Sequence, residues 1–361
     1  MRKVRVSLGN KSYAVYIGSG LLTQTRDWLR ESGFSGKLVI ITDPTVNKLY
    51  GEALSQRLTE GGFKLNTLLV PEGEEQKSLE TAGRLYHELT NAHAERSTPI
   101  LALGGGVIGD LAGFVAATYS RGVPLVQIPT TLLAQVDSSV GGKVAVDHGQ
   151  LKNKVGAFYQ PKLVIADTDT LRTLPAEELA NGLAEVIKSA AIRDKKFFAF
   201  LEESLDRVKS LDGKTLEEIV FQSVRIKAEV VEKDEMDLGL RSILNYGHTI
   251  GHAIESVSDF TFRHGQAIAI GMVAAARISN QMGILDENGL VRLKNVIEKA
   301  GLPAKMPELK VEEVIQAMKH DKKVWRDKVR FVLLKSIGSV FVTDDVNPSL
   351  VKKVLVSDEK T

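Results

Sequence analysis

The sequence predicts an N-terminal α/β domain over residues 1–174, followed by an all-α or mainly helical domain over residues 175–361. Three observations lead to this prediction. The chain has 361 residues, which is the length of about two domains. Short apolar segments alternate with helical patterns as far as Leu174, whereas nearly every pattern after Pro175 is helical. This order is typical of a largely parallel sheet with its helices, joined to a helical domain.

The composition excludes several classes of protein. The 47 Lys and Arg residues exceed the 45 Asp and Glu by only two charges, so no net charge attracts the chain to nucleic acid or to an acidic membrane. The most apolar segment, 267–276, is about half the length of a membrane span and predicts a buried helix. We therefore expect a soluble cytoplasmic protein. The chain has no cysteine, so any metal must be bound by histidine and carboxylate side chains.

The first domain is predicted from short strands separated by helices. Apolar residues alternate on both sides of the Gly9-Asn10 turn, which predicts a hairpin. Helical patterns then separate apolar segments that read as buried strands, which predicts a mainly parallel sheet covered on both faces. The expected strands are 4–8, 13–17, 37–42, 65–70, 99–103, 123–128 and 163–166, with helices over about 43–61 and 79–91.

The second domain is predicted to begin at Pro175, because proline suits the first turn of a helix and the acidic pair Glu177 and Glu178 suits its positive end. A small strand pair over 329–334 and 340–343 comes near the end of the chain. The expected helices are 176–192, 196–206, 215–232, 244–258, 267–281 and 286–300.

A glycine loop, Gly104-x-Gly106-x-x-Gly109, follows a predicted strand and opens a helix. Glycines allow the backbone to approach a pyrophosphate, and the helix N-terminus supplies free N–H groups. The alternative is a tight turn without a ligand. Because the loop does not follow the first strand and 122–131 has no acidic residue, we predict a dinucleotide site of a topology other than the Rossmann type. Its ribose contacts would come from earlier strand ends, at Asp43 or in the turn 72–77.

A second glycine segment, 138–143, does not form a phosphate-binding P-loop. Residue 137 is Asp where that motif begins with Gly, and Val144 replaces the Ser or Thr that would bind magnesium. Lys143, Lys152 and Asn153 nevertheless have the chemistry to line a phosphate pocket. The alternative is that they are solvated loop residues.

Three histidines and an acidic residue predict a metal site. His248 and His252 lie four residues apart and share one face of a predicted helix, and His264 follows after a short loop. Glu185 lies in an otherwise apolar helical segment, where a carboxylate is costly to bury unless it is paired or binds a metal. Glu255 is the alternative carboxylate, and buried structural histidines are the alternative to a metal site. Spacing does not tell which histidine remains free for proton transfer.

These motifs together closely resemble the 3-dehydroquinate synthase family, and the match runs over nearly the whole chain. That family shares its architecture, an NAD-binding α/β domain beside a helical metal-binding domain, with glycerol dehydrogenases and iron-type alcohol dehydrogenases. The motifs that carry the resemblance are GGGVIGDLAGFVAATYSRGV, QIPTTLLAQVDSSVGGK, KN-x-x-GAFYQP, LPAEELANGLAEVIK, and LNYGHTIGHAIE followed by HG.

The resemblance implies that Glu185, His248 and His264 bind zinc or cobalt, which leaves His252 for proton transfer. It also implies an NAD site formed by residues at several predicted strand ends. The expected NAD contacts are Asp43, Glu72, Gly73, Glu74, Lys77, Gly105, Gly106, Val107, Ile108, Gly109, Asp110, Thr130, Thr131, Lys143, Lys152, Thr170, Leu171, Arg172 and Thr173.

The resemblance further implies a cationic pocket for a small sugar phosphate. Arg121 is expected to reach the phosphate pocket of a neighbouring subunit, so a homodimer is expected. Besides His252, the implied catalytic residues are Lys188, Lys143, Asn153 and Arg121, and the implied substrate-binding residues are Asp137, Lys152, Lys227, Arg241, Asn245, Lys322 and Lys323.

The reaction implied by the family is the conversion of 3-deoxy-D-arabino-heptulosonate 7-phosphate to 3-dehydroquinate and phosphate, a lyase step of the shikimate pathway. It proceeds through transient oxidation by NAD, phosphate elimination, reduction and intramolecular aldol closure. The alternatives are another sugar phosphate cyclase, a metal- and NAD-dependent polyol dehydrogenase, or an inactive NAD-binding protein. Arg241, Asn245 and the Lys322-Lys323 pair favour a substrate that bears a carboxylate.

Two segments depart from the family pattern. Gln266 stands where the family usually has Glu, and we expect this to alter a partner of His264 and to weaken metal binding. Residues 144–147 replace a more usual Thr-Ala-Ile-Asn.

Overall fold

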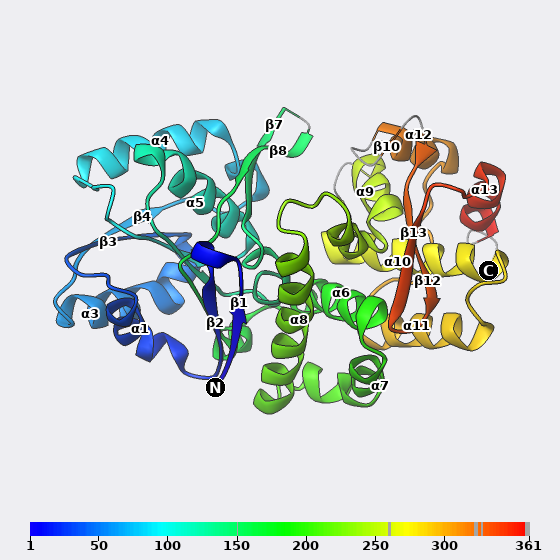
Figure 1. Cartoon of the computed structure of the whole chain (residues 1–361), viewed down its shortest axis with the longest axis horizontal. Helices are drawn as coiled ribbons and strands as arrows, with labels where there is room; N and C mark the ends of the chain where they lie inside the picture. The colour runs from blue at the N-terminus through cyan, green and yellow to red at the C-terminus, as the bar shows by residue number, and fades with distance from the viewer. Residues whose placement is uncertain (150, 259–260, 321–323, 326–327, 358–361) are drawn as a thin grey trace. The chain divides into compact units, whose positions relative to one another are not determined.

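The computed structural model describes residues 1–149, 151–258, 261–320, 324–325 and 328–357 (Figure 1). The chain divides into two compact units: the first comprises 1–174 and 213–236, and the second comprises 175–212 and 237–361. Within the described part of the chain, no helix has the length and hydropathy needed to cross a lipid bilayer.

The first unit is built on a seven-stranded sheet in the order β1-β2-β9-β6-β5-β3-β4. The hairpin β1–β2 is antiparallel, and all other neighbouring strands pair in parallel, which confirms the predicted sheet. Its strands are β1 (Arg2–Val6), β2 (Tyr13–Gly18), β3 (Lys37–Thr42), β4 (Lys64–Leu69), β5 (Ile100–Gly104), β6 (Leu125–Pro129) and β9 (Leu163–Asp167).

Helices cover both faces of this sheet, so the central strands are apolar on both sides. Val39 and Ile41 of β3 pack with the helices α4 and α5, whereas Leu38 and Ile40 pack with α1 and α3. Figure 1 shows α4 and α5 on one face of the sheet and α1 and α3 on the other. This explains why 37–42 reads as a continuous apolar run rather than as an alternation. The helices are α1 (Thr25–Glu31), α2 (Pro44–Val46), α3 (Glu52–Glu60), α4 (Leu79–Asn91) and α5 (Gly106–Thr118).

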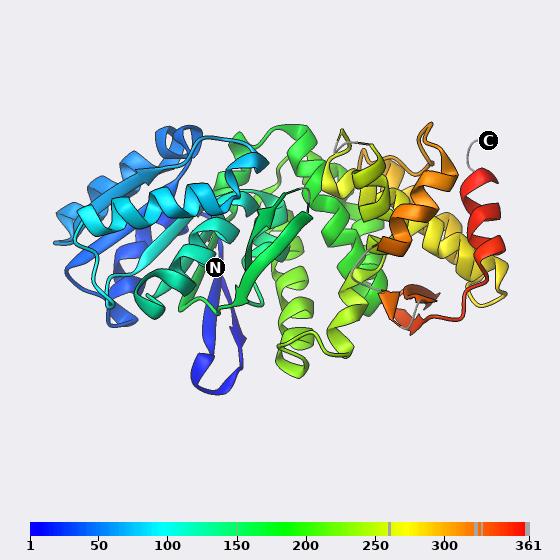
Figure 2. The same cartoon turned by 90° about the horizontal axis from the view of Figure 1, so that it is seen from above.

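Helix α8 (Gly213–Lys233) was predicted to belong to the second domain. In the structure it packs on the first unit instead. It lies beside the N-terminal hairpin (Figures 1 and 2). Arg2 pairs with Glu218 at 2.5 Å near the start of α8, and the N–H of Ser7 donates to Glu232 at 2.6 Å near its end. An amphipathic pattern predicts a helix but does not identify the part of the protein against which its apolar face packs.

A two-stranded antiparallel sheet, β7 (Lys143–His148) with β8 (Leu151–Phe158), also belongs to the first unit and was not predicted. Lys143, Lys152 and Asn153 therefore lie on strands rather than in a loop. Val144 and Val146 of β7 are buried. A Cβ at Gly113 of α5 would lie 2.3 Å from Val144, so this contact depends on glycine at that position.

The second unit is helical, with two small hairpins. The predicted pair near the chain end is β12 (Phe331–Ser336) with β13 (Ser339–Thr343), and β10 (Val324–Trp325) pairs with β11 (Lys328–Val329). Helices α12 and α13 fall outside the predicted ranges. The helices are α6 (Ala176–Arg193), α7 (Lys195–Lys209), α9 (His248–Val257), α10 (His264–Gln281), α11 (Glu287–Lys299), α12 (Val311–His320) and α13 (Pro348–Ser357).

Glycines allow the backbones of α9 and α10 to come into direct contact. A Cβ at Gly271 of α10 would lie 2.0 Å from the carbonyl oxygen of Gly247, far below any real contact. Gly247 itself precedes α9 with a φ of 81°, a left-handed conformation that favours glycine. Because Gly247 and Gly251 face α10, the adjacent residues His248 and His252 share the neighbouring face of α9.

We expect Gly271→Ala to destabilise the protein by about 3 kcal/mol, because the added methyl group forces the two helices apart. Urea denaturation measures the free energy of unfolding. The matched control is Gly83→Ala in α4, where an added Cβ meets nothing within 4 Å. Alanine there should be neutral or stabilising by about 0.5–1 kcal/mol. Equal effects of the two substitutions would contradict this account of the helix packing.

Candidate functional site

The structure brings together three of the side chains that the sequence predicted for a metal site. Glu185 lies in the middle of α6, and His248 and His264 are the first residues of α9 and α10. The Nε2 atoms of both histidines lie 3.6 Å from Oε1 of Glu185. Tetrahedral zinc with bonds of about 2.1 Å separates its ligand atoms by about 3.4 Å. The donor atoms therefore fit one divalent ion of this kind.

Hydrogen bonds at the other ring nitrogens orient both imidazoles. Nδ1 of His248 lies 3.2 Å from the carbonyl oxygen of Tyr246, and Nδ1 of His264 lies 3.4 Å from Oε2 of Glu255. A carbonyl oxygen only accepts, so this hydrogen bond assigns a proton to Nδ1 of His248 and leaves Nε2 facing Glu185. A carboxylate partner at Nδ1 is typical of a metal-binding histidine and raises its basicity.

Glu255 is therefore the carboxylate partner of His264 in this structure, and the side chain of Gln266 makes a different hydrogen bond. Oε1 of Gln266 accepts the N–H of Arg263 at 3.0 Å, which caps the start of α10. Glutamine has the same acceptor as glutamate for this bond, so the departure from the family pattern leaves the partner of His264 in place.

The two oxygens of Glu185 face different groups. Oε2 forms an ion pair with Lys188, one turn further along α6, and Oε1 faces the two imidazoles. The side chains of Glu185 and Lys188 are each 2% exposed. A buried carboxylate and a buried ammonium are tolerated only together, since either one alone would carry a large desolvation cost.

The negative charges of Glu185 and Glu255 favour a cation beside His264. Burial alone would lower the pKa of His264, but the hydrogen bonds to Glu185 and Glu255 and their charges raise it to about 9. Without a metal, this imidazole consequently retains a proton at neutral pH. A divalent ion at Nε2 would replace that proton.

His252 belongs to the same cluster, which we call the histidine cluster (His248, His252 and His264). Its ring centroid lies 5.1 Å from that of His248 and 6.0 Å from that of His264. His252, Glu255 and His264 form a second group whose ligand-type atoms lie within 4.8 Å of one another. The geometry thus leaves His252 close to the metal-type site formed with Glu185.

The residues predicted to bind a dinucleotide, apart from Lys143 on β7 and Lys152 on β8, follow the carboxyl ends of parallel strands in the first unit. The chain runs from β3 to β4 on one side and then to β5 on the other, so the strand order reverses between β3 and β5. Open parallel sheets bind ligands at this edge, beside such a point. Asp43 follows β3, residues 72–77 follow β4, residues 105–110 follow β5, Thr130 and Thr131 follow β6, and the turn Thr170–Thr173, which includes Leu171 and Arg172, follows β9.

The glycine loop at this edge opens α5 without a side-chain cap. The N-terminal N–H groups of α5 are therefore available for an anion. Gly109 lies against β6, because a Cβ there would approach Oε1 of Gln127 to 3.0 Å, and Nε2 of Gln127 donates to the Gly109 carbonyl at 3.0 Å. Helix α5 is thus held closely against the sheet beside the loop.

Charged side chains at the same edge are partly buried. Nζ of Lys77 pairs with Asp110 at 2.8 Å and with Glu74 at 3.8 Å. Burial alone would lower the pKa of Lys77, but Asp110 and Glu74 raise it, so the ammonium stays charged. Asp43 accepts the N–H of Val46 at 2.8 Å, and burial together with the charge of Glu72 raises the pKa of Asp43.

The residues predicted to bind substrate are divided between the two units. In the first, Nζ of Lys227 on α8 donates to the backbone and side-chain oxygens of Asp137, both at 2.6 Å. Arg121 is exposed, with a left-handed φ of 63°. In the second, Lys188 lies on α6, and Arg241 and Asn245 lie in the short helix η8 (Leu240–Asn245). Lys322 and Lys323 lie outside the described residues.

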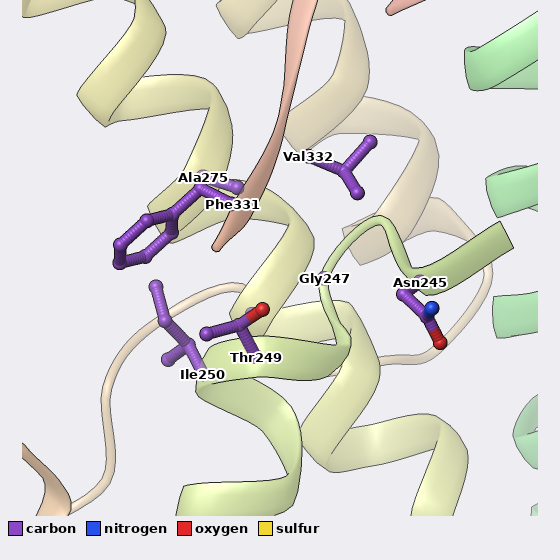
Figure 3. Close-up of a pocket in the computed structure, with 8 residues that line it drawn as sticks. Asn245, Gly247, Thr249, Ile250, Ala275, Phe331 and Val332 are labelled. Carbon is purple, nitrogen blue, oxygen red and sulfur yellow. The ribbon is translucent and has the colours of Figure 1, made fainter. Parts of the chain in front are cut away.

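A small cavity of about 10 Å³ lies between α9, α10 and β12 in the second unit. Its volume is that of at most one water molecule, so it is too small for a substrate. Asn245 is the one lining residue that the sequence predicted to bind substrate. Figure 3 shows the side chains of Thr249, Ile250 and Phe331 around this cavity, and Gly247, Gly271, Ala275 and Val332 complete its lining.

Comparisons with known proteins agree with this architecture. Family models described as the N-terminal and C-terminal parts of 3-dehydroquinate synthase match residues 67–181 and 182–324. A 3-dehydroquinate synthase from Dehalococcoides mccartyi (strain CBDB1) is 49% identical over 346 residues, which is 96% of each chain.

Two solved structures share the fold over the whole chain. One is 2-epi-5-epi-valiolone synthase from Streptomyces hygroscopicus subsp. jinggangensis 5008 with NAD⁺ and Zn²⁺ bound, at a TM-score of 0.91 and 27% identity, covering 98% of each chain. The other is 2-deoxy-scyllo-inosose synthase complexed with carbaglucose-6-phosphate, NAD⁺ and Co²⁺, at a TM-score of 0.90 and 28% identity, covering 99% of this chain and 100% of that one.

The fold is therefore that of the sugar phosphate cyclases. Within this class, identity is far higher to the 3-dehydroquinate synthase than to the two cyclases of solved structure. The chain belongs to the 3-dehydroquinate synthase family.

We expect Glu185→Ala and His264→Ala each to lose most bound zinc, because each removes one of the three converging ligand atoms. His252→Ala should keep its zinc but lower turnover by about 10²–10⁴-fold, the usual contribution of a general acid or base. Metal content after gel filtration and steady-state kinetics measure these effects, with circular dichroism as the control for folding. Loss of zinc from His252→Ala would mean that the wrong histidine has been assigned to proton transfer.

Proposed function

We propose that this chain converts 3-deoxy-D-arabino-heptulosonate 7-phosphate to 3-dehydroquinate and inorganic phosphate. The observation that carries the choice of reaction is its 49% identity, over 96% of each chain, to a curated 3-dehydroquinate synthase. The solved cyclases named for other products are only 27% and 28% identical. The enzyme is accordingly a lyase of aromatic amino acid biosynthesis.

The proposal includes a divalent ion, zinc or cobalt, held by Glu185, His248 and His264. The spacing of the three donor atoms and the hydrogen bonds at both Nδ1 atoms support this assignment. It also includes NAD at the carboxyl edge of the sheet, supported by the uncapped start of α5 and by the strand order. When bound, the metal supplies Lewis acidity at the substrate hydroxyls and NAD supplies a transient oxidation that makes the adjacent C–H acidic.

The protein's own residues then bind, orient and move protons. His252 is the proton acceptor for the hydroxyl that is oxidised, because it lies beside His248 and is not needed to complete the metal-type site. Lys188 forms an ion pair with Oε2 of Glu185, which keeps Oε1 turned toward the two imidazoles. Asp137 holds the ammonium of Lys227 at a fixed position.

The basic residues bind the negatively charged groups of the substrate in this proposal. A phosphate dianion and a carboxylate both need cationic partners, and Lys143, Lys152 and Arg241 supply them in this proposal. Asn153 and Asn245 add neutral hydrogen-bonding groups. Lys322 and Lys323 are proposed to join them from outside the described residues.

The proposal extends to assembly and location. We propose a homodimer in which the exposed Arg121 reaches the phosphate pocket of the neighbouring subunit, and a cytoplasmic enzyme. The left-handed backbone at Ser120 and Arg121 supports a fixed direction for this arginine, since non-glycine residues adopt such φ values only where the surroundings impose them.

We expect phosphate release from the heptulosonate phosphate only when both NAD⁺ and a divalent metal are present. Colorimetric phosphate assay with and without EDTA and NAD⁺ tests this, and NADH absorbance is followed in parallel. NADH should not accumulate, because the reaction regenerates NAD⁺. Glucose 6-phosphate, which lacks the carboxylate, is the control substrate. Stoichiometric NADH without phosphate release would indicate a polyol dehydrogenase and would contradict the proposal.

A further inference from the structure

The start of α10, which carries His264, obtains one of its N-terminal hydrogen-bond acceptors from a different helix. Gly265 is the second residue of α10, and its N–H donates to Oδ1 of Asn181 on α6 at 2.5 Å. The first N–H groups of a helix have no partner within the helix, so they require acceptors from elsewhere. Asn181, 84 residues away in the chain, supplies one of them.

The contact between the two helices is direct. A Cβ at Gly265 would lie only 2.1 Å from the carbonyl oxygen of Asn181, so glycine allows the first turn of α10 to lie on the backbone of α6. The side chain of Asn181 is 7% exposed, and its Nδ2 donates to Glu178 at 3.2 Å. These two partners, an N–H and a carboxylate, together fix the orientation of the amide.

The residue on the other side of His264 is held to α6 as well. Arg263 forms ion pairs with Glu177, at 2.7 Å, and with Glu178. His264 is thus flanked by two anchors on the first turns of α6. Glu185 lies one turn beyond Asn181 on the same helix, so the anchors and the carboxylate belong to one rigid element.

We infer that Asn181 is a positioning residue that sets the distance between His264 and Glu185, and thereby the affinity of the metal site. The inference rests on the proposed function, because it assumes that these two side chains bind the same ion. The amide does not itself reach the metal: it fixes the backbone of the adjacent residue. Metal sites are sensitive to such outer partners, whose loss typically costs 10–100-fold in affinity.

The test compares two substitutions, each of which removes one buried hydrogen bond that a residue of α10 donates to another element. Asn181→Leu keeps the shape of the side chain and removes the acceptor for Gly265. Ser279→Ala removes the bond that the Ser279 hydroxyl donates to the carbonyl of Leu334, fifteen residues beyond His264 and so about 22 Å along the helix. Zinc affinity is measured by competition with a chromophoric chelator, and unfolding midpoints are measured with and without zinc chloride.

We expect Asn181→Leu to weaken zinc binding by about 10–100-fold and to reduce the stabilisation that zinc adds by the corresponding amount. Ser279→Ala should bind zinc within about twofold of the unsubstituted protein. Wild-type affinity in Asn181→Leu, or an equal loss in both variants, would overturn the inference. If Asn181→Leu does not fold, Asn181→Ala removes the same acceptor without added bulk and decides the question in the same way. Failure of the unsubstituted protein to bind zinc would instead refute the proposed metal site.

Discussion

The buried carboxylate of Glu185 is the constraint on which the second unit depends. Its side chain is 2% exposed, and a carboxylate in such a place is stable only when charges and donors surround it. Lys188 forms an ion pair with one oxygen, and the imidazoles of His248 and His264 face the other. Three helices, α6, α9 and α10, consequently meet at a single acidic group. The same arrangement that makes the carboxylate tolerable also gives a divalent ion three converging donors.

The spacing of those helices is set by glycine. Gly271 lies against the backbone of Gly247, and Gly265 lies against the backbone of Asn181, so α10 touches both α9 and α6 without intervening side chains. Short helix–helix distances bring the first residues of α9 and α10 within reach of Glu185. Because the donors stand on packed helices rather than on loops, their separation is fixed before any metal binds, which is what a precise metal site requires.

The sequence predicted those parts of the molecule that local pattern determines. The buried strand 37–42, the acidic first turn of α6 and the glycine loop all have local signatures. Features that depend on distant partners were missed or misassigned. Helix α8 has an ordinary amphipathic pattern, and its contacts with the N-terminal hairpin, such as the ion pair of Arg2 with Glu218, show that it belongs to the first unit. The histidine cluster was predicted from spacing, but the roles of Glu255, Gln266 and Asn181 depend on residues far away in sequence or on side-chain direction.

The central claim is that one divalent ion lies between Glu185, His248 and His264. The most direct measurement is an anomalous difference map at the zinc absorption edge, from crystals grown with zinc chloride and NAD⁺. This account predicts one strong peak bonded to both Nε2 atoms and to Oε1 of Glu185, at about 2.0–2.2 Å from each. A map with no peak among these three side chains, or a peak bonded to His252 and Glu255 instead, would contradict it.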